Sequence, residues 1–158
     1  MVRQCNDHDF HAILEILNDG HSEAENNLPL ALPEKDPMTP DDLHLEMASG
    51  MIFWGYEDNG ELAGIMGVQN IDSYTLIRHL SVRPASRRRG IGSELLDYFR
   101  HFTILPMLVH IDKNASVKRA FYQKNGLSPL SEDISALLLK KYWNITEQLA
   151  ELYEVLAE

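Results

Sequence analysis

Cysteine is nearly absent from this sequence, and the absence limits the class of protein. Cys5 is the one cysteine among 158 residues, so the chain cannot form an internal disulfide. This excludes the small secreted folds that depend on several disulfides. A chain of this length can bury a full hydrophobic core without such bonds, so we expect a single domain over residues 1–158. We interpret Cys5 as a packed strand residue, because no partner for a catalytic thiol is identifiable.

Positive charge is also scarce. The chain has 14 Lys and Arg residues against 24 Asp and Glu residues, which gives a formal net charge of −10. Binding to nucleic acid requires an excess of Lys and Arg to neutralise phosphates, so this balance argues against a nucleic-acid partner. An acidic surface permits a basic substrate such as an amine. It also makes any local cluster of arginines informative, because the rest of the surface repels anions.

Long hydrophobic runs and metal-binding patterns are missing as well. No segment approaches the roughly 18 consecutive apolar residues that a membrane span needs. Residues 1–10 lack the apolar stretch of a signal peptide, so we expect a cytoplasmic protein with no membrane partner. His8 and His11 have a spacing seen in metal sites, but no carboxylate or cysteine pattern accompanies them, and we predict no metal.

The N-terminal part of the chain shows a helical spacing of apolar residues. Residues 7–18 predict a helix that ends at an Asn-Asp-Gly sequence. Thr39 and Pro40 provide an N-cap and a first-turn proline for a second helix, which we expect to run to about Ala48. Residues 19–38 are polar and contain three prolines, so we expect a loop or an irregular helical segment that could border a substrate site.

The middle of the chain predicts strands followed by alternating helices and strands. Asn59-Gly60 is a strong hairpin signal between two apolar segments. The mixture of elements and strand directions predicts an α/β or α+β protein. The predicted strands cover residues 2–5, 51–57, 62–71, 74–82 and 107–112, and the predicted helices cover residues 90–102 and 116–125.

The C-terminal part contains one ambiguous segment and one with a clear helical pattern. Residues 134–143 form a short apolar run that periodicity assigns to neither helix nor strand. Residues 145–157 are rich in good helix formers, and their leucines fall on one helical face after a plausible cap at Asn144. We therefore predict a C-terminal helix.

The most informative segment runs from Leu80 to Ser93, where a strand ends, a basic loop follows and a helix begins at two glycines. A helix N-terminus offers unpaired N–H groups and a partial positive charge, and glycine lets a phosphate approach the backbone. Arg87, Arg88 and Arg89 add full positive charge, as a pyrophosphate would require. The alternative is a solvated basic loop at an ordinary strand–helix junction. A Walker loop and a dinucleotide fingerprint are excluded by the residues after Gly92.

Two motifs in this region resemble those of a known family. Arg87-x-x-Gly90-x-Gly92 resembles the Gln/Arg-x-x-Gly-x-Gly/Ala motif of the GNAT superfamily, the acetyl-CoA-dependent N-acetyltransferases. Residues 120–127, Ala-Phe-Tyr-Gln-Lys-Asn-Gly-Leu, resemble the family's Phe/Leu-Tyr-x-Lys-x-Gly-Phe segment. The order of predicted elements is similar to the GNAT fold as far as about residue 143.

The resemblance implies a fold, an activity and a set of site residues. The fold would be a central mixed, mostly antiparallel sheet of six or seven strands flanked by about four helices. The activity would be transfer of an acetyl group from acetyl-CoA to a primary amine of a small molecule or peptide, by direct attack without a covalent enzyme intermediate or a metal. Tyr122 matches a tyrosine that protonates the departing thiolate in many members. The residues implied in binding CoA are Leu80, Val82, Arg87, Arg88, Arg89, Gly90, Ile91, Gly92, Ser93 and Asn114.

Several positions depart from the family pattern or have a second interpretation. Asn114 lies one position away from the family's asparagine, and a helix N-cap or turn residue is the alternative. Residues 74–79 contain no carboxylate that could order a deprotonating water. His79 is the candidate base, although strand alternation turns it away from Leu80, and a structural or surface histidine is the alternative. Tyr122 could instead be a buried aromatic residue.

The resemblance also bears on the C-terminal part and on partners. GNAT domains usually finish with an antiparallel strand pair, which implies strands at residues 127–130 and 134–143. The helix at 145–157 would then be an appendage that packs on the domain or on a second subunit, and family members often form homodimers. A CoA-binding module without turnover is the alternative function. Nucleic-acid binding through Arg87 to Arg89 is a third hypothesis, which the net charge opposes.

Overall fold

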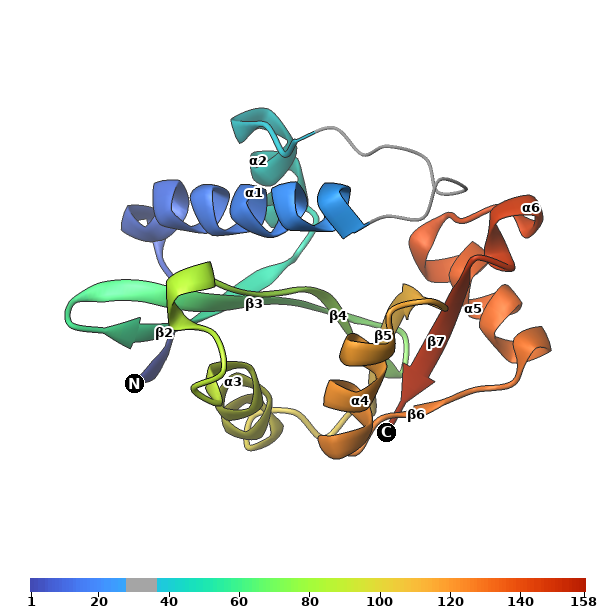
Figure 1. The fold of residues 1–158 in the computed structure, drawn as a ribbon. Helices are drawn as coiled ribbons and strands as arrows, with labels where there is room; N and C mark the ends of the chain where they lie inside the picture. Colours follow the sequence, from blue (N-terminus) through green and yellow to red (C-terminus); the bar gives the residue numbers. More distant parts are fainter. Residues whose placement is uncertain (28–36) are drawn as a thin grey trace. The chain divides into compact units, whose positions relative to one another are not determined.

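The computed structural model describes residues 1–27 and 37–158, and its centre is a mixed sheet of seven strands in the order β1-β2-β3-β4-β5-β7-β6 (Figure 1). The pairs β1–β2, β2–β3, β5–β7 and β6–β7 are antiparallel, and β4–β5 is parallel. This confirms the predicted fold class. The strands are β1 (Val2–Gln4), β2 (Ile52–Asp58), β3 (Glu61–Ile71), β4 (Tyr74–Val82), β5 (Met107–Asp112), β6 (Ser128–Pro129) and β7 (Tyr153–Ala157). The helices are η1 (Asp7–Asp9), α1 (Phe10–Asn27), α2 (Pro40–Ala48), η2 (Pro84–Ser86), α3 (Ile91–Arg100), α4 (Ser116–Lys124), α5 (Glu132–Trp143) and α6 (Glu147–Ala150).

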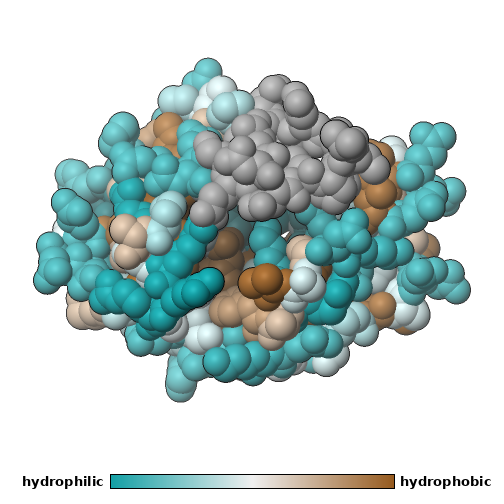
Figure 2. Space-filling view, viewed as in Figure 1, coloured by the Kyte–Doolittle hydropathy of each residue, from teal (hydrophilic) through white to brown (hydrophobic). Residues whose placement is uncertain are grey.

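The chain divides into two compact units. Unit 1 contains residues 1–70 and 77–104, and unit 2 contains residues 71–76 and 105–158. Each is described separately below. In the helices of the described residues, no segment is both long and apolar enough to cross a bilayer. Figure 2 shows mostly hydrophilic residues on one face of the molecule, as a formal net charge of −10 would suggest.

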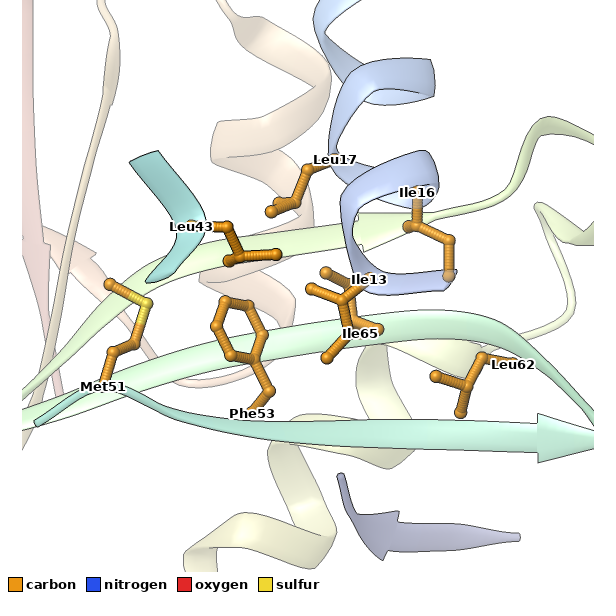
Figure 3. Close-up of a cluster of buried hydrophobic side chains, with 8 residues drawn as sticks. All are labelled: Ile13, Ile16, Leu17, Leu43, Met51, Phe53, Leu62 and Ile65. Atoms are coloured by element: carbon orange, nitrogen blue, oxygen red, sulfur yellow. The ribbon is translucent and has the colours of Figure 1, made fainter. Parts of the chain in front are cut away.

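The core of unit 1 lies between β2, β3 and the helices α1 and α2. Figure 3 shows this cluster, in which side chains from the two helices meet side chains from the two strands. Figure 1 shows α1 and α2 on one side of β2 and β3, and α3 on the other. Alternating residues of the strands therefore face different helices. The cluster consists of Ile13, Ile16, Leu17, Leu43, Met51, Phe53, Leu62 and Ile65.

Capping explains where the N-terminal helices begin. Thr39 accepts a hydrogen bond from the Asp42 amide at 3.1 Å, and Asp42 accepts one from the Thr39 amide at 3.0 Å. This capping box, followed by Pro40, confirms the predicted start of α2. Asn6 and Asp9 form a second capping box, so the first helical turn begins after Asn6.

Helix α1 is longer than predicted. It continues to Asn27, whereas the sequence analysis placed a stop at Gly20 and a loop from residue 19. Asn18 does not end the helix, because its side-chain amide pairs with the backbone N–H and C=O of Met38, at 2.9 and 3.1 Å. A single glycine in a helix costs only about 1 kcal/mol, which other interactions can outweigh. Of the two alternatives predicted for residues 19–38, the loop was therefore wrong and the helical segment correct for residues 19–27, and residues 28–36 lie outside the described residues.

Gly64 brings β3 unusually close to the start of α3. A Cβ atom at this position would lie 2.9 Å from Ile91 Cγ2 and 3.3 Å from both Ser81 O and Val82 Cγ2. Ile91 is buried, at the first turn of α3. A glycine in the strand therefore sets how closely the helix start packs on the sheet.

Replacing Gly64 by alanine should destabilise the fold through this contact. The added methyl group must displace Ile91 or the strand, and overpacking of this kind costs about 2 kcal/mol. Chemical denaturation of the Gly64→Ala variant should show the loss as a lower free energy of unfolding. An unchanged unfolding midpoint would mean that Ile91 moves without cost, so that the close approach is not required.

Unit 2 contains β5, β6, β7, the start of β4 and three helices. Two parallel pairs, Thr75 with Met107 and Leu76 with Leu108, join β4 to β5, whereas β7 pairs with β5 over five residues. The Tyr142 hydroxyl donates a hydrogen bond to Asp72 Oδ2 at 2.8 Å, which ties the end of α5 to the β3–β4 turn. This hydrogen bond is the largest cause of the lowered pKa of Asp72.

The structure corrects the implied strand at residues 134–143, which is the helix α5. Ser131 caps its first turn by accepting a hydrogen bond from the Ile134 amide at 3.3 Å. Asn144 adopts the left-handed conformation at its C-cap. Ser135, Leu139 and Tyr142 are buried at the spacing of one helical face. The local sequence thus specifies a helix, and the implied strand was wrong.

The predicted C-terminal helix at residues 145–157 was also wrong. Only the four residues Glu147–Ala150 are helical, and Tyr153–Ala157 form β7. Tyr153 and Val155 are buried on alternate positions, and all five residues of the strand pair with β5. Pairing along β5 outweighs the helix propensity of this segment. The sheet does end in an antiparallel pair, in which β6 lies within the implied strand at residues 127–130 and its partner is β7.

Candidate functional site

The β4–α3 junction places a helix N-terminus at the end of a basic loop. Gly90 is the N-cap of α3 and has φ +77°, a left-handed conformation that favours glycine. It has no side chain to cap the helix, and the first helical hydrogen bond runs from the Glu94 amide to the Gly90 carbonyl at 3.0 Å. The amides of Ile91 and Gly92 therefore come before the hydrogen bonds of the helix, and Ser93 follows them half-buried. Such a helix start can accept an anion.

The three arginines of this loop are not equivalent. Arg87 is exposed, and its Nε donates a hydrogen bond to the Val82 carbonyl at 3.2 Å. Arg88 is exposed and left-handed, with φ +61°. Arg89 forms an ion pair with Asp58 at 2.8 Å, and the hydrogen bond and charge of that carboxylate raise the pKa of Arg89. Asp58 thus neutralises one of the three positive charges.

Strand β4 changes its hydrogen-bonding side along its length. The Thr75 amide donates to Pro106 O at 3.0 Å, on the side of β5, whereas the Arg83 amide donates to Ala63 O at 2.8 Å, on the side of β3. In a regular strand, residues an even number apart direct their N–H groups to the same side. We infer one irregular step between them. Adjacent residues of a strand direct their main-chain groups to opposite sides. Since the Arg83 amide points to β3, the main-chain groups of Val82 point away from β3.

His79 lies on the opposite face of β4 from the α3 contact. Its Nε2 is 2.9 Å from Glu46 Oε2 of α2, and its ring stacks on Phe53 with centroids 6.0 Å apart and planes 12° apart. Val82, by contrast, lies near Gly64 and Ile91 on the side of α3. The alternation that the sequence predicted for this strand is therefore present. Unit 1 thus places Val82 on the same side as the start of α3, whereas His79 faces α2.

The other two candidates, Tyr122 and Asn114, belong to unit 2. Tyr122 is buried on α4, and its burial raises the pKa of the phenol. Within the described parts of the chain, no hydrogen bond to its hydroxyl is present. Asn114 is exposed in the turn before α4, where its carbonyl accepts from the Ser116 amide at 3.0 Å. The N-cap of α4 is Ala115, so the N-cap interpretation of Asn114 was wrong and it is a turn residue.

Comparison with known proteins decides the family. A sequence model of the acetyltransferase (GNAT) domain matches residues 49–127, which is half of the chain and includes the β4–α3 junction and Tyr122. The chain belongs to the GNAT family. This match contains both motifs that carried the resemblance in the sequence.

Solved structures share the GNAT fold at low sequence identity. The PaiA N-acetyltransferase of Thermoplasma acidophilum, in complex with coenzyme A, is 15% identical with a TM-score of 0.74, over 100% of this chain and 97% of that one. A GNAT-family acetyltransferase of Staphylococcus aureus Mu50 is 16% identical with a TM-score of 0.71, over 100% and 97%. A putative acetyltransferase of Salmonella typhimurium, with its cofactor acetyl-CoA, is 19% identical with a TM-score of 0.63, over 83% and 80%.

Two carboxylates that the sequence did not point to contact candidate site residues. Glu46 and Asp58 contact His79 and Arg89 only after the chain has folded, and no sequence motif marks either carboxylate. Burial raises the pKa of Cys5 to about 12, so its thiol stays protonated near neutral pH. His11 lies 4.0 Å from Glu15, and no group of three or more metal ligands occurs in the part of the chain that the structure describes.

Proposed function

We propose that this GNAT protein transfers an acetyl group from acetyl-CoA to a primary amine of a small molecule or peptide. The observation that carries the proposal is the N-terminus of α3, where Gly90 leaves the amides of Ile91 and Gly92 without a side-chain cap beside exposed arginines. We propose a cytoplasmic enzyme that acts as one domain over residues 1–158. The mechanism requires neither a metal nor a covalent enzyme intermediate.

The loop at residues 87–93 would hold the CoA pyrophosphate. Backbone amides at Gly90, Ile91, Gly92 and Ser93 supply donors, and the helix dipole adds a partial positive charge. Arg87 and Arg88 would pair with phosphate oxygens, while Arg89 would hold the loop through Asp58. The main-chain groups of Leu80 and Val82 would pair with the pantetheine arm, and Asn114 would be a weaker contact to CoA.

The chemistry is direct attack of the amine on the thioester carbonyl. A carbon–nitrogen bond forms, the carbon–sulfur bond breaks, and the amine loses one proton. His79 would accept that proton, and the Val82 N–H would stabilise the oxyanion that develops on the carbonyl oxygen. The Tyr122 hydroxyl would donate a proton to the departing thiolate. Burial raises the pKa of the phenol, so Tyr122 carries its proton at neutral pH.

Two observations support an amine acceptor. Structures of similar fold include a ribosomal-protein-S18-alanine N-acetyltransferase from Escherichia coli, at 14% identity, and a putative phosphinothricin N-acetyltransferase, at 18%. Both are named for transfer of an acetyl group to nitrogen. The net charge of −10 also suits a cationic acceptor better than an anionic one.

Release of free thiol from acetyl-CoA tests the proposal. The purified chain is incubated with acetyl-CoA and, separately, spermidine, L-lysine, phosphinothricin or a peptide with an N-terminal alanine. We expect thiol release that depends on one of these amines, together with a product heavier than the amine by one acetyl group. Acetyl-CoA without an amine is the control. Binding of CoA without thiol release for any amine would contradict the enzymatic proposal and favour a CoA-binding module.

A further inference from the structure

We propose that Glu46 on α2 is a positioning residue that fixes the orientation and tautomer of His79, so that Nδ1 of the imidazole receives the proton of the acceptor amine. This inference rests on the proposed function for its chemical consequence. Its structural part, the state of the imidazole, can be tested without any turnover.

The contact between the two side chains is short and partly shielded from water. Glu46 Oε2 lies 2.9 Å from His79 Nε2, with 32% and 21% of the two side chains exposed. One face of the imidazole lies against Phe53, whose ring is nearly parallel to it. Within the described residues, the ring is thus held by an aromatic stack and by one hydrogen bond at a single nitrogen.

The chemistry of the carboxylate selects the tautomer. An ionised carboxylate can only accept hydrogen bonds, so the proton between the two groups must be carried by His79 Nε2. In the neutral imidazole, the second nitrogen then has a lone pair and no proton. Nδ1 is therefore the nitrogen that can act as a base. When it takes a proton, the imidazolium is paired with the carboxylate of Glu46.

The end of α2 that carries Glu46 is itself anchored to the sheet. Gln69 of β3 donates from Nε2 to the Ser49 carbonyl at 3.0 Å, just after α2. Gln69 Oε1 accepts from Arg78 Nε and Nη2 at 3.1 and 2.9 Å. Arg78 also interacts electrostatically with Glu46. These contacts hold the helix end, so the carboxylate is positioned before any ligand binds.

Among the described groups that surround the imidazole, the carboxylate of Glu46 is the one that forms a hydrogen bond with it. Glu46 faces it from α2, Arg78 is adjacent on β4 and lies within range of the Glu46 charge, and β2 contributes the uncharged ring of Phe53. The family pattern of a carboxylate on the strand is absent here, since residues 74–79 contain none. The carboxylate is instead supplied from a helix and acts through the histidine.

Nitrogen chemical shifts of the imidazole test the structural part directly. In protein labelled with ¹⁵N-histidine, the resonance of His79 is assigned by its loss in the His79→Gln variant. In spectra recorded at a pH high enough for the imidazole to be neutral, we expect its proton on Nε2 in the unaltered protein, and a mixture of both tautomers in Glu46→Ala. Asp41→Asn removes a carboxylate of the same charge from the exposed first turn of α2 and should change nothing. A proton on Nδ1 in the unaltered protein, or no change in Glu46→Ala, would overturn the proposal.

Kinetics with the fastest amine of the four-member panel test the chemical part. Glu46→Ala should lower kcat about tenfold, a fraction of the loss on removing a general base, and change the KM for the amine less than about twofold. Glu46→Asp should restore part of kcat. In the His79→Gln background, Glu46→Ala should have no further effect, because the two residues act as one unit. Additive losses, or a higher KM with unchanged kcat, would show that Glu46 contacts the amine instead.

Two controls separate the failures from one another. If Glu46→Ala unfolds, Glu46→Gln keeps the size of the side chain and removes its charge, and is expected to lower kcat in the same way. If no amine of the panel is acetylated, the proposed function fails, and the nitrogen shifts still decide whether Glu46 fixes the tautomer of His79.

Discussion

Gly92→Asp should weaken the binding of acetyl-CoA about a hundredfold. Gly92 lies in the first turn of α3, where the amides precede the helical hydrogen bonds, so a new carboxylate there would face the pyrophosphate. Two unit charges about 5 Å apart at an effective dielectric constant of about 20 repel by about 3 kcal/mol, which is about a hundredfold in Kd. Titration calorimetry with CoA measures the change.

Gly92→Asp should weaken the binding of CoA without lowering the stability of the fold. An acidic residue in the first turn of a helix is stabilising by about 0.3–1 kcal/mol, so Gly92→Asp should unfold at the same temperature or a higher one. Gly92→Asn adds a side chain of the same shape without the charge and should lose less affinity. Raising the salt concentration should reduce the difference between the two variants. Equal affinity of Gly92→Asp and the unaltered protein would show that the pyrophosphate binds elsewhere.

Tyr122→Phe should lower kcat about a hundredfold while leaving the Kd for CoA nearly unchanged. Removing a general acid costs about two orders of magnitude or more, and the phenylalanine keeps the packing of the ring. The pKa of Tyr122 is raised by burial, so its proton is retained throughout the neutral range. The activity of the unaltered enzyme should therefore show no loss from Tyr122 below about pH 10, the usual tyrosine range.

Stability provides the second readout for Tyr122. Its hydroxyl makes no hydrogen bond within the described residues, so its loss should change the free energy of unfolding by less than about 1 kcal/mol. Tyr98→Phe, on the exposed side of α3, is the matched control and should keep full activity. Full activity of Tyr122→Phe would support the alternative that Tyr122 is a core residue only. A large loss of CoA affinity would contradict a purely acidic role.

The parts of the fold that the sequence predicts well are those with strong local signals. The capping box at Thr39, the Asn59-Gly60 turn and the glycines at the start of α3 each act within a few residues of chain. The basic loop is contiguous as well, so its role as an anion site could be expected before the structure was known. Such features depend on local backbone geometry and survive in any fold that contains them.

The parts that could not be predicted depend on contacts between distant residues. Tyr153–Ala157 form a strand because β5 is available to pair with them, although the longer segment 145–157 is rich in good helix formers. The apolar run at residues 134–143 was ambiguous between helix and strand, and the family pattern favoured a strand, whereas the segment is the helix α5 capped at Ser131. The partnership of His79 with Glu46 joins positions 33 residues apart, for which a single sequence contains no signal.

The exposed arginines of the β4–α3 loop have a kinetic consequence in so acidic a molecule. CoA is a polyanion, and a protein of net charge −10 repels it at long range, which slows their encounter when little salt is present. Arg87 and Arg88 can overcome that repulsion only within about one Debye length, ~8 Å at physiological ionic strength. Moderate salt should therefore speed the approach of CoA to this protein, whereas it slows association in the more familiar case of a basic cleft.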